Sequence, residues 1–565
     1  MALWSACVVV IALGALADLR RARVELETAR RQADPAALAE GEPLELMGRA
    51  YGHLADASVS LRSPIIAPAR QLPVVGRQLR SAAALSTAAR NVAGAALDGL
   101  TAAQEILSGP RPAGPARVAV ARRLAEVAGD TERRLARIDL GPRIALFPAL
   151  ARTYNELAGE LDALRSALAR ARLAASGVAE VLQGPSRYLL FAANNAEMRA
   201  GSGMFLSVGE LTMEDGAFTV GAMRTVTDVA VPPGTVPLTG DYADRWGWLE
   251  PNVEWRNLML SPRFDVNAPL AADMWRAAGG GPVDGVLAVD PVALAALLGG
   301  TGPIDVDGRP LSEETVVDEL LYHQYTRFSP EEVTARRDEL GRVAEALFMA
   351  LEAGQGTLAG LARGLGEAAG GRHLLAWSMR PELREIWQEL GVDGSLGDDS
   401  LQLSLLNRSG TKLDRFLRTS ATVTVTDGPE GGMGVTIDVT VANEVPTGEH
   451  PYIAGPVANT GAVEGEYVGL LAVQLPAVAR GGRIEPSEGL AVAGPDGPTR
   501  VVAAPFNLRR GEEKHFAVRF ELPVPSASLR VEASARVPPS RWSYGSQRWV
   551  DDRTRAVVLR GGSGG

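Results

Sequence analysis

Residues 187–216 read RYLLFAANNAEMRAGSGMFLSVGELTMEDG, and this pattern decides the fold of the central region. The stretch begins with YLLFAA, a short apolar run that suits a buried strand. It ends with an alternating strand that is closed by a turn at Glu214, Asp215 and Gly216, which predicts a β-hairpin. Between the two strands we predict a polar loop, placed at the edge where α/β sheets usually bind their ligands.

The predicted loop is rich in side chains that form hydrogen bonds. Its candidate ligand-binding positions are Asn194, Asn195, Glu197, Arg199, Gly201 and Gly203. An arginine can bind a phosphate, a carboxylate with an amide can hold a hard cation, and glycines let backbone N–H groups approach a ligand. The alternative interpretation is a structural loop in which the asparagine side chains satisfy nearby backbone groups.

Strands and helices alternate after the hairpin. Residues 283–308, VDGVLAVDPVALAALLGGTGPIDVDG, predict a strand, a helix and a strand, with Asp290 as a cap or turn residue. Residues 312–328 and 329–351 each begin with a serine followed by acidic residues, which predicts two more helices. This alternation predicts an α/β domain over residues 185–415.

Two further polar patches in this region are candidate sites. They contribute Arg224 and Asp228 from MRTVTDV, and Tyr325, Arg327, Arg336 and Arg337 from YHQYTRF and TARRDELGR. Arginines can neutralise a phosphate, and an aspartate can ligate a metal ion. The alternatives are an exposed ion pair at a strand end for the first patch and a solvated, charged helix for the second.

The composition sets limits on the class of protein. A chain of 565 residues is too long for one hydrophobic core, so we expect several domains. The net charge of −10 argues against general nucleic-acid binding, which needs a basic face. The single cysteine, Cys7, excludes an intramolecular disulfide. Lys412 and Lys514 are the only lysines, so nearly every basic residue is an arginine.

The N-terminal region divides into two predicted parts. Residues 1–17 carry no charged side chain, so we expect either a membrane anchor or a signal segment with an A-x-A-like site at its end. The alternative is a soluble protein in which this helix is buried. Arginines follow this stretch, which on the positive-inside rule alone would place the body in the cytoplasm. Residues 18–183 show helical periodicity interrupted by prolines, which predicts a helical stalk or bundle.

The C-terminal region has a different pattern. From residue 416 to 560 the chain alternates polar and apolar residues in short runs such as GVTIDVTVAN, separated by Gly/Pro turns. This pattern predicts an immunoglobulin-like β-sandwich, and the last residues, 561–565, are expected to form a flexible tail. The fold class expected for the whole chain is therefore multidomain α+β.

Several segments together resemble a known bacterial family. LLFAANNAEMRAGSGMF, PVDGVLAVDPVALAALLGGTGPIDVDG, RRDELGRVAEALFMAL and LNRSGTKLDRFL resemble the domain of unknown function 4012 family. The resemblance covers roughly residues 19–555 and is most specific at NNAEMR and VDGVLAVDP. It implies an N-terminal membrane anchor, single-pass, with an extracytoplasmic body.

The order of elements in the central region also resembles, more distantly, the LytR-CpsA-Psr family. Those phosphotransferases move polyprenyl-pyrophosphate-linked glycopolymers to cell-wall acceptors, with arginines on the pyrophosphate and aspartates on Mg²⁺. The residues that match their catalytic positions are Arg199, Arg224, Asp228, Arg336 and Arg337. By the same resemblance, Glu197 and Asp228 would hold Mg²⁺. The pattern departs from the family because Arg224 and Asp228 are not adjacent and because Glu197 stands where an aspartate is usual.

These observations give three hypotheses for function. The first is an extracytoplasmic cell-envelope protein that handles a lipid-pyrophosphate-linked glycan and transfers it to a wall acceptor. The second is a non-catalytic envelope scaffold that binds glycan or protein partners. The third is a surface adhesion protein that acts mainly through its β-sandwich. An apolar groove leading to Arg199 would favour the first hypothesis, and a closed core around Arg199 would favour the second.

Overall fold

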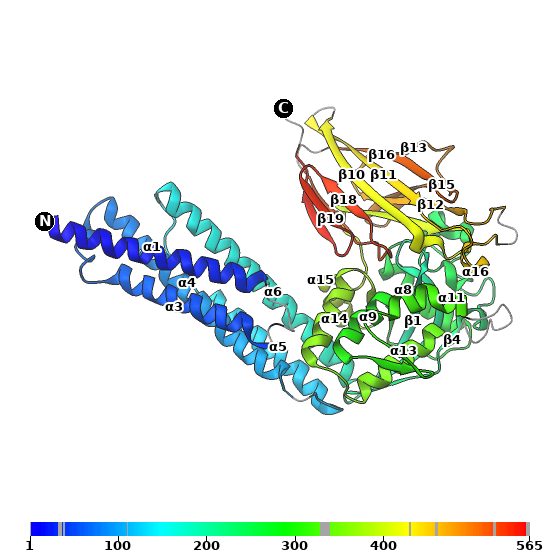
Figure 1. Cartoon of the computed structure of the whole chain (residues 1–565), viewed down its shortest axis with the longest axis horizontal. Helices are drawn as coiled ribbons and strands as arrows, with labels where there is room; N and C mark the ends of the chain where they lie inside the picture. Colours follow the sequence, from blue (N-terminus) through cyan, green and yellow to red (C-terminus); the bar gives the residue numbers. More distant parts are fainter. Residues whose placement is uncertain are drawn as a thin grey trace. The chain divides into compact units, whose positions relative to one another are not determined.

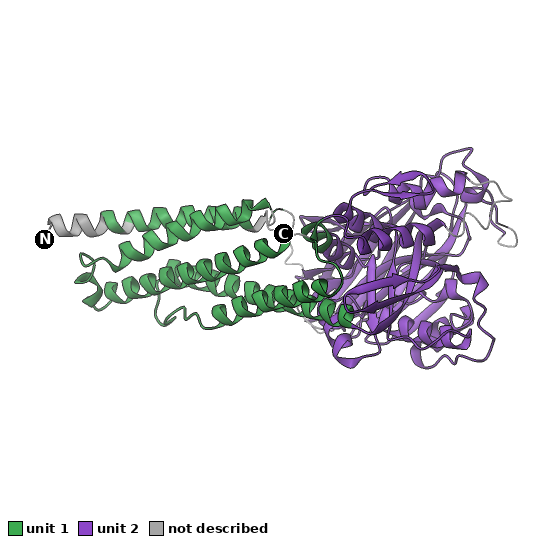
Figure 2. Ribbon diagram, turned by 90° about the horizontal axis from the view of Figure 1, so that it is seen from below, with its two compact units in different colours: residues 1–183, 357–363 green, residues 184–356, 364–565 purple. Residues whose placement is uncertain are grey.

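A computed structural model describes residues 2–31, 37, 40–109, 111–327, 339–428, 431–457, 461–523 and 527–560. The chain divides into two compact units (Figure 2). The first unit comprises residues 1–183 with 357–363, and the second comprises residues 184–356 with 364–565. The predicted helical region therefore lies in the first unit, and the predicted α/β and β regions lie almost entirely in the second.

The first unit is a bundle of long helices, as the sequence predicts. These are α1 (Ala2–Arg31), α3 (Glu42–Arg62), α4 (Val75–Leu107), α5 (Pro115–Ala136) and α6 (Pro148–Gln183). The breaks between the helices fall at prolines, because a proline is tolerated in the first turn of a helix but not in its interior. Within the described residues, no helix combines the length and the apolar character needed to cross a membrane.

The central sheet of the second unit has the strand order β3-β2-β1-β5-β8, with β4 also paired to β2. Its strands are β1 (Ser186–Met198), β2 (Gly203–Glu214), β3 (Ala217–Val220), β4 (Arg224–Thr225), β5 (Gly285–Val289) and β8 (Leu374–Ser378). Strands β1 and β5 are parallel, while β1–β2, β2–β3, β2–β4 and β5–β8 are antiparallel. The predicted hairpin is confirmed, since Glu214 pairs with Ala217.

Helices and a small sheet accompany the central sheet (Figure 1). They are α7 (Gly240–Trp246), α8 (Phe264–Ala277), α9 (Pro291–Thr301), α10 (Val316–Asp318), α11 (Gln324–Arg327), α13 (Glu339–Glu352), α15 (Pro381–Leu390), β6 (Ile304–Val306) and β7 (Arg309–Leu311). Helix α14 (Leu358–Gly370) belongs to the first unit up to residue 363 and to the second unit from residue 364. The predicted strand–helix–strand segment is therefore confirmed as β5, α9 and β6. Asp290 is the N-cap of α9, because its carboxylate accepts hydrogen bonds from the N–H groups of Val292 and Ala293.

The prediction of a loop after residue 193 is wrong, because β1 continues to Met198. Asn194 still pairs with Met204, and Met198 pairs with Gly203 after an irregularity in the ladder. At Gly203 a Cβ atom would lie 2.3 Å from the carbonyl carbon of Asn194. This glycine therefore permits a close approach between β1 and β2. The sequence analysis had predicted that it permits the close approach of a ligand.

Two β-sheets form the C-terminal part of the second unit. One has the order β13-β16-β11-β10-β18-β19, and the other has the order β14-β15-β12-β9-β17-β20. The strands are β9 (Ser400–Asn407), β10 (Leu417–Asp427), β11 (Met433–Asn443), β12 (Tyr467–Pro476), β13 (Arg480–Glu485), β14 (Val492–Asp496), β15 (Thr499–Leu508), β16 (Glu513–Leu522), β17 (Ser528–Val531), β18 (Arg541–Tyr544), β19 (Gln547–Val550) and β20 (Arg555–Val558). A short helix, α16 (Pro451–Ala454), precedes β12.

The hydrophobic cores show how these parts of the second unit are joined. One core lies between the two C-terminal sheets and includes Ile437 of β11 and Val473 of β12. A second core combines the central sheet with the C-terminal sheet that contains β12, since Phe191 of β1 and Leu470 of β12 belong to it. The chain is thus a mixed α+β protein with N-terminal helices and β-rich C-terminal sheets, and its second unit has a continuous interior.

Candidate functional site

The polar residues at the end of β1 lie inside the protein. Asn194 is 1% exposed, Asn195 0%, Glu197 5% and Arg199 7%. We call these four residues, together with their side-chain partners described below, the β1 polar cluster. A polar group buried at this depth destabilises the fold unless it has a hydrogen-bond partner, so the partners decide what the cluster can do.

The two asparagines bind to three different segments of the second unit. The amide nitrogen of Asn194 donates to the hydroxyl of Tyr325. The amide nitrogen of Asn195 donates to Oδ2 of Asp290 at 2.8 Å and to the carbonyl oxygen of Ala535 at 2.7 Å. The same Oδ2 of Asp290 lies 2.6 Å from Nδ1 of His373. These contacts fix β1 against α9, α11 and the C-terminal sheets.

Glu197 forms a buried ion pair with Lys412. The ammonium nitrogen of Lys412 lies 2.6 Å from the Glu197 carboxylate, and both side chains are 6% exposed. The same ammonium lies 5.5 Å from the ring centroid of Tyr325 and 5.2 Å from that of Tyr452, so both aromatic faces attract it. The two rings stack on each other at 5.6 Å. The carboxylate predicted to bind a cation is therefore neutralised by a lysine.

Arg199 donates its hydrogen bonds to acceptors of the protein itself. Its Nε binds the carbonyl oxygen of Arg256 at 2.9 Å, and its Nη2 binds Oδ1 of Asn257 at 3.3 Å. Its Nη1 binds the carbonyl oxygens of Met198 at 3.1 Å and Asn407 at 2.8 Å. Burial of the guanidinium lowers the pKa of Arg199. The side chain joins β1, the segment before α8, and β9.

A second buried ion pair completes the β1 polar cluster. Asp414, which follows β9, lies 3.2 Å from Nη1 of Arg536, and these side chains are 0% and 1% exposed. The Asp414 carboxylate also accepts the N–H of Met198 at 3.1 Å and the amide of Asn407 at 2.8 Å. Burial raises the pKa of Asp414, and Arg536 opposes that rise.

Sequence analysis missed Lys412, Asp414 and Arg536 as members of the cluster. Two signals were present: Lys412 is one of only two lysines, and both Lys412 and Asp414 lie in LNRSGTKLDRFL, a segment that carries the family resemblance. An arginine at position 412 would present a wide planar group, whereas a lysine presents a compact ammonium to one carboxylate and two ring faces.

The other predicted site residues lie in different surroundings. Arg224 and Asp228 are exposed, and Nη2 of Arg224 donates to the backbone oxygen of Asp228 at 2.9 Å. Arg327 pairs with Glu319 and Glu339, and Glu339 also pairs with Arg309 and Arg342. The backbone N–H of Gly201 donates to Met259 at 3.1 Å. Arg336 and Arg337 lie outside the described residues.

The predicted metal site depends on acidic or histidine side chains that lie close together. Among the residues that the structure describes, no group of three or more His, Cys, Asp or Glu side chains is placed to hold a metal ion. Glu197 is engaged by Lys412, and Asp228 is exposed on the surface. Mg²⁺ at Glu197 and Asp228 stays a prediction from the resemblance to the LytR-CpsA-Psr family.

Asp551, close to the β1 polar cluster, makes stability depend on pH. Its carboxylate is 3% exposed, and burial raises its pKa to about 6 although Ser534 donates two hydrogen bonds to it. Because the folded-state pKa is raised, the stabilisation is complete below the unfolded-state pKa near 4 and is lost as pH rises through about 6.

We therefore expect Asp551→Asn to gain stability relative to the parent chain as pH increases. The gain between pH 4.5 and pH 7.5 should be on the order of 2 kcal/mol, measured by urea unfolding at both pH values. Asp438→Asn, at an exposed position of β11, is the control and should show no such change. Equal pH profiles for Asp551→Asn and the parent would contradict the assignment.

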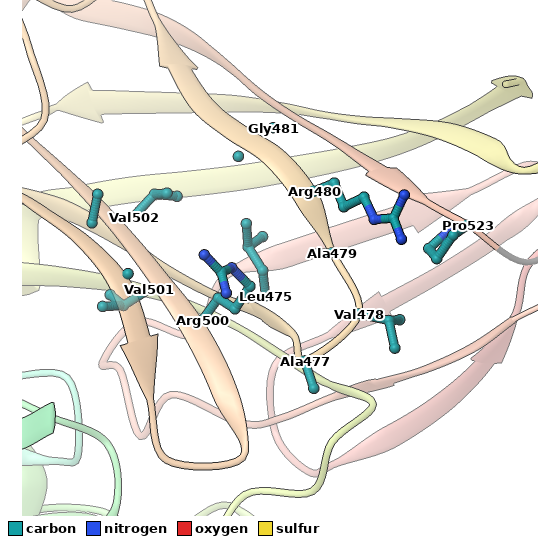
Figure 3. A pocket seen from close by; sticks show the side chains of 13 residues that line it. Leu475, Ala477, Val478, Ala479, Arg480, Gly481, Arg500, Val501, Val502 and Pro523 are labelled. Carbon is teal, nitrogen blue, oxygen red and sulfur yellow. The ribbon is translucent and has the colours of Figure 1, made fainter. Parts of the chain in front are cut away.

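A hollow between the C-terminal sheets offers the open cationic surface that the β1 polar cluster lacks. Its volume is 580 Å³, and it is lined by the β12–β13 connection, β14 and β15, with Leu475, Val501 and Val502 among its apolar residues. Figure 3 shows the side chains of Arg480 and Arg500 in its lining, and no lining residue is acidic. Within the described part of the chain, neither arginine has an ion pair or a side-chain hydrogen bond. We call this feature the Arg480–Arg500 hollow.

The comparisons with known proteins identify one similar family. Neither the curated proteins nor the solved structures contain a match to this chain. Residues 183–325, which include β1, β2, β5 and α9, match the model of the family described as "Protein of unknown function (DUF4012)", and over these residues the match confirms the predicted resemblance to that family.

Proposed function

We propose that this protein is a non-catalytic scaffold of the cell envelope that binds an acidic glycan. The observation that carries the proposal is the state of Arg199, whose guanidinium donates to Arg256, Met198, Asn407 and Asn257 inside a closed core. An arginine that neutralises a pyrophosphate would have to give up these bonds. The buried pairing of Glu197 with Lys412 supports the same conclusion for the predicted cation ligand.

The proposal includes a finer assignment of the folds in the second unit. We assign the central sheet to a LytR-CpsA-Psr-like domain and the C-terminal sheets to an immunoglobulin-like β-sandwich. The parallel β1–β5 pair with α9 following β5 supports the first assignment. The core shared by two mainly antiparallel sheets supports the second.

The cellular location is part of the proposal. The uncharged residues 1–17 and the family resemblance support an N-terminal anchor, single-pass, with the body on the extracytoplasmic side. In that location the protein meets acidic wall and capsule polymers. The net charge of −10 opposes nucleic acid as a partner, and it means that an acidic glycan has to bind at a local cationic surface.

The Arg480–Arg500 hollow is the proposed glycan-binding surface. Its volume of 580 Å³ falls in the range of small-ligand sites, which is roughly 300–1,000 Å³. Arginine forks suit carboxylates and phosphates, and the apolar residues beside them can contact the C–H face of a sugar ring. An acidic sugar presents both kinds of surface at once.

The double variant Arg480→Ala/Arg500→Ala tests the binding surface. We expect calorimetry to detect binding of a uronic acid oligosaccharide to the parent chain and a loss of affinity of about tenfold or more in the variant, because each charge-assisted hydrogen bond contributes about 1.5–3 kcal/mol. Arg483→Ala is the matched control, since Arg483 is also on β13 but pairs with Glu485. Equal affinity for a neutral oligosaccharide of the same length would contradict the proposal.

The alternative function, transfer of a lipid-pyrophosphate-linked glycan, is tested on the same purified chain. Binding of a polyprenyl pyrophosphate analogue is measured with and without Mg²⁺. Mg²⁺-dependent binding by the parent, weakened in Arg336→Ala/Arg337→Ala or in Asp228→Ala, would overturn the scaffold proposal. No binding by the folded parent supports it.

A further inference from the structure

Large apolar side chains are exposed at one end of the helical bundle. The connection between α3 and α4 exposes Ile65 (44%), Leu72 (49%) and Val74 (60%), and Val75 at the start of α4 is 49% exposed. The connection between α5 and α6 exposes Ile144 (79%) and Phe147 (53%). We call residues 62–80 and 137–147 the bundle tip. Soluble proteins rarely leave such side chains grouped in water unless the surface has a partner.

Hydrogen bonds hold the two connections of the bundle tip together. The side-chain amide of Gln78 donates to the carbonyl oxygen of Ala145 at 2.9 Å and accepts the N–H of Phe147 at 2.9 Å. A Cβ at Gly141 would lie 3.0 Å from the Cβ of Ala84, so the second connection also packs against α4. The exposed apolar residues therefore belong to one surface formed by two segments far apart in sequence.

The N-terminal part of α1 reaches the same end of the bundle. Ala15 of α1 packs with Leu61 at the end of α3 and with Ala83 of α4, whereas Ala22 packs with Leu54 and Ala93. Helix α1 therefore runs antiparallel to α3, and these helices lie side by side with α4 (Figure 1). The turns before Ala15, in which Val10 and Leu13 are 67% and 60% exposed, extend toward the bundle tip.

The charges of the bundle tip are opposite in sign to those of the whole chain. Its arginines are Arg62, Arg70, Arg77, Arg80, Arg137 and Arg143, and its only acidic residue is Asp139. The chain as a whole carries a net charge of −10. In the described part of the chain, Arg62, Arg77 and Arg143 form neither an ion pair nor a side-chain hydrogen bond. These guanidinium groups are available to an anionic partner.

We propose that the bundle tip is a membrane-contacting surface that selects anionic lipid bilayers. Val74, Ile144 and Phe147 enter the headgroup region, and Arg62, Arg77 and Arg143 bind lipid phosphates beside them. The combination of exposed apolar side chains with arginines is the composition that peripheral membrane surfaces use. The inference deepens the proposed location at a membrane and does not depend on glycan binding.

The test places an environment-sensitive label on each end of the bundle. In the full chain with Cys7→Ser, an NBD label is attached to Ile144→Cys at the tip or to Val178→Cys on α6, which is 37% exposed. Helix α6 begins after the tip, so Val178 lies roughly 45 Å farther along it. We expect vesicles containing phosphatidylglycerol to increase the fluorescence of the label at 144 about twofold or more and to leave the label at 178 unchanged.

Charge reversal tests the role of the arginines. Arg62→Glu/Arg77→Glu/Arg143→Glu should reduce the response at 144 and require about tenfold more anionic lipid for the same signal. An equal response to phosphatidylcholine vesicles would overturn the proposal. A change in the fluorescence of the label at 144 that depends on protein concentration in the absence of vesicles would also overturn it, because the partner would then be a second copy of the chain.

Co-sedimentation separates this inference from the proposed anchor. If the protein co-sediments with vesicles but the fluorescence of the label at 144 does not change, the bundle tip proposal is overturned and the N-terminal anchor is supported. Absence of co-sedimentation with any vesicle would overturn both. Glycan binding by the Arg480–Arg500 hollow is measured without lipid and is independent of either result.

Discussion

Lys412→Met is expected to lower the free energy of unfolding of the second unit by about 3–5 kcal/mol, because it leaves the Glu197 carboxylate buried without its ion-pair partner. Methionine is close to lysine in length and fills the space between Tyr325 and Tyr452, so the loss reports on charge more than on packing. Urea unfolding followed by tryptophan fluorescence is suited to this measurement, since every tryptophan except Trp4 lies in the second unit.

The matched control is the other lysine of the chain. Lys514 is 37% exposed and lies 3.7 Å from Glu512, so Lys514→Met should change the unfolding free energy by no more than about 0.5 kcal/mol. The double variant Glu197→Met/Lys412→Met should be more stable than Lys412→Met, because replacing both ions of a buried pair removes the unpaired charge. Equal effects of Lys412→Met and Lys514→Met would contradict the buried pair.

Asp414→Ala should lower the free energy of unfolding at least as much as Lys412→Met does. The substitution leaves the Arg536 guanidinium buried without its carboxylate and removes the acceptor for the N–H of Met198 and the amide of Asn407. We expect a loss of about 3–5 kcal/mol in the unfolding free energy, with Asp414→Asn losing less because it keeps one acceptor oxygen. Asp438→Ala, at an exposed position, is the control.

Hydrogen exchange distinguishes a local effect from a general loss of stability. Because Asp414 accepts the N–H of Met198, the peptide that contains the end of β1 should lose protection in Asp414→Ala more than the peptide that contains α9. Uniform loss of protection over both peptides would mean that Asp414 does not specifically hold β1. Unchanged protection at Met198 would contradict the contact itself.

These two predictions concern the same property of the β1 polar cluster. A ligand site keeps charged groups available, whereas the charged side chains of this cluster have partners within the protein and join β1 to β9 and the C-terminal sheets. Within the part of the chain that the structure describes, Asn195 Oδ1 and Arg536 Nε are buried without a hydrogen-bond partner. The large expected losses follow from burial, since the same ion pairs at the surface would contribute less than about 1 kcal/mol. The scaffold proposal therefore makes Lys412 and Asp414 stability residues, and places ligand recognition elsewhere in the second unit.

Much of the local structure could be predicted from the sequence because it depends on short-range patterns. The turn at Asp215 and Gly216 closes the β2–β3 hairpin, and Asp290 before Pro291 starts α9 as an N-cap. Prolines predicted the ends of the bundle helices, since a proline interrupts the helical hydrogen-bond pattern wherever it falls. In the C-terminal region, the alternation of polar and apolar residues predicted the strands. This pattern is also local, because a period of two places the apolar side chains on one face of a strand.

The sequence could not predict the surroundings of the β1 polar cluster. NNAEMR has the composition of a polar loop, and its partners lie far away in the chain. They include Asp290 and Tyr325, which are 95 and 131 residues from the asparagines they contact, and Lys412 and Asp414. Hydrogen bonds between such distant segments form only when the tertiary fold brings the segments together, so a local sequence pattern does not predict them.

By itself, the sequence determined most of the helices and strands, the resemblance to a bacterial family over residues 183–325 and the acidic character of the chain. The tertiary structure decided which polar side chains are bound to other groups inside the protein and which remain available to a partner. The physical reason is desolvation: a buried arginine such as Arg199 must bind the acceptors around it, whereas exposed ones such as Arg480 and Arg143 keep their donors for a ligand or a lipid.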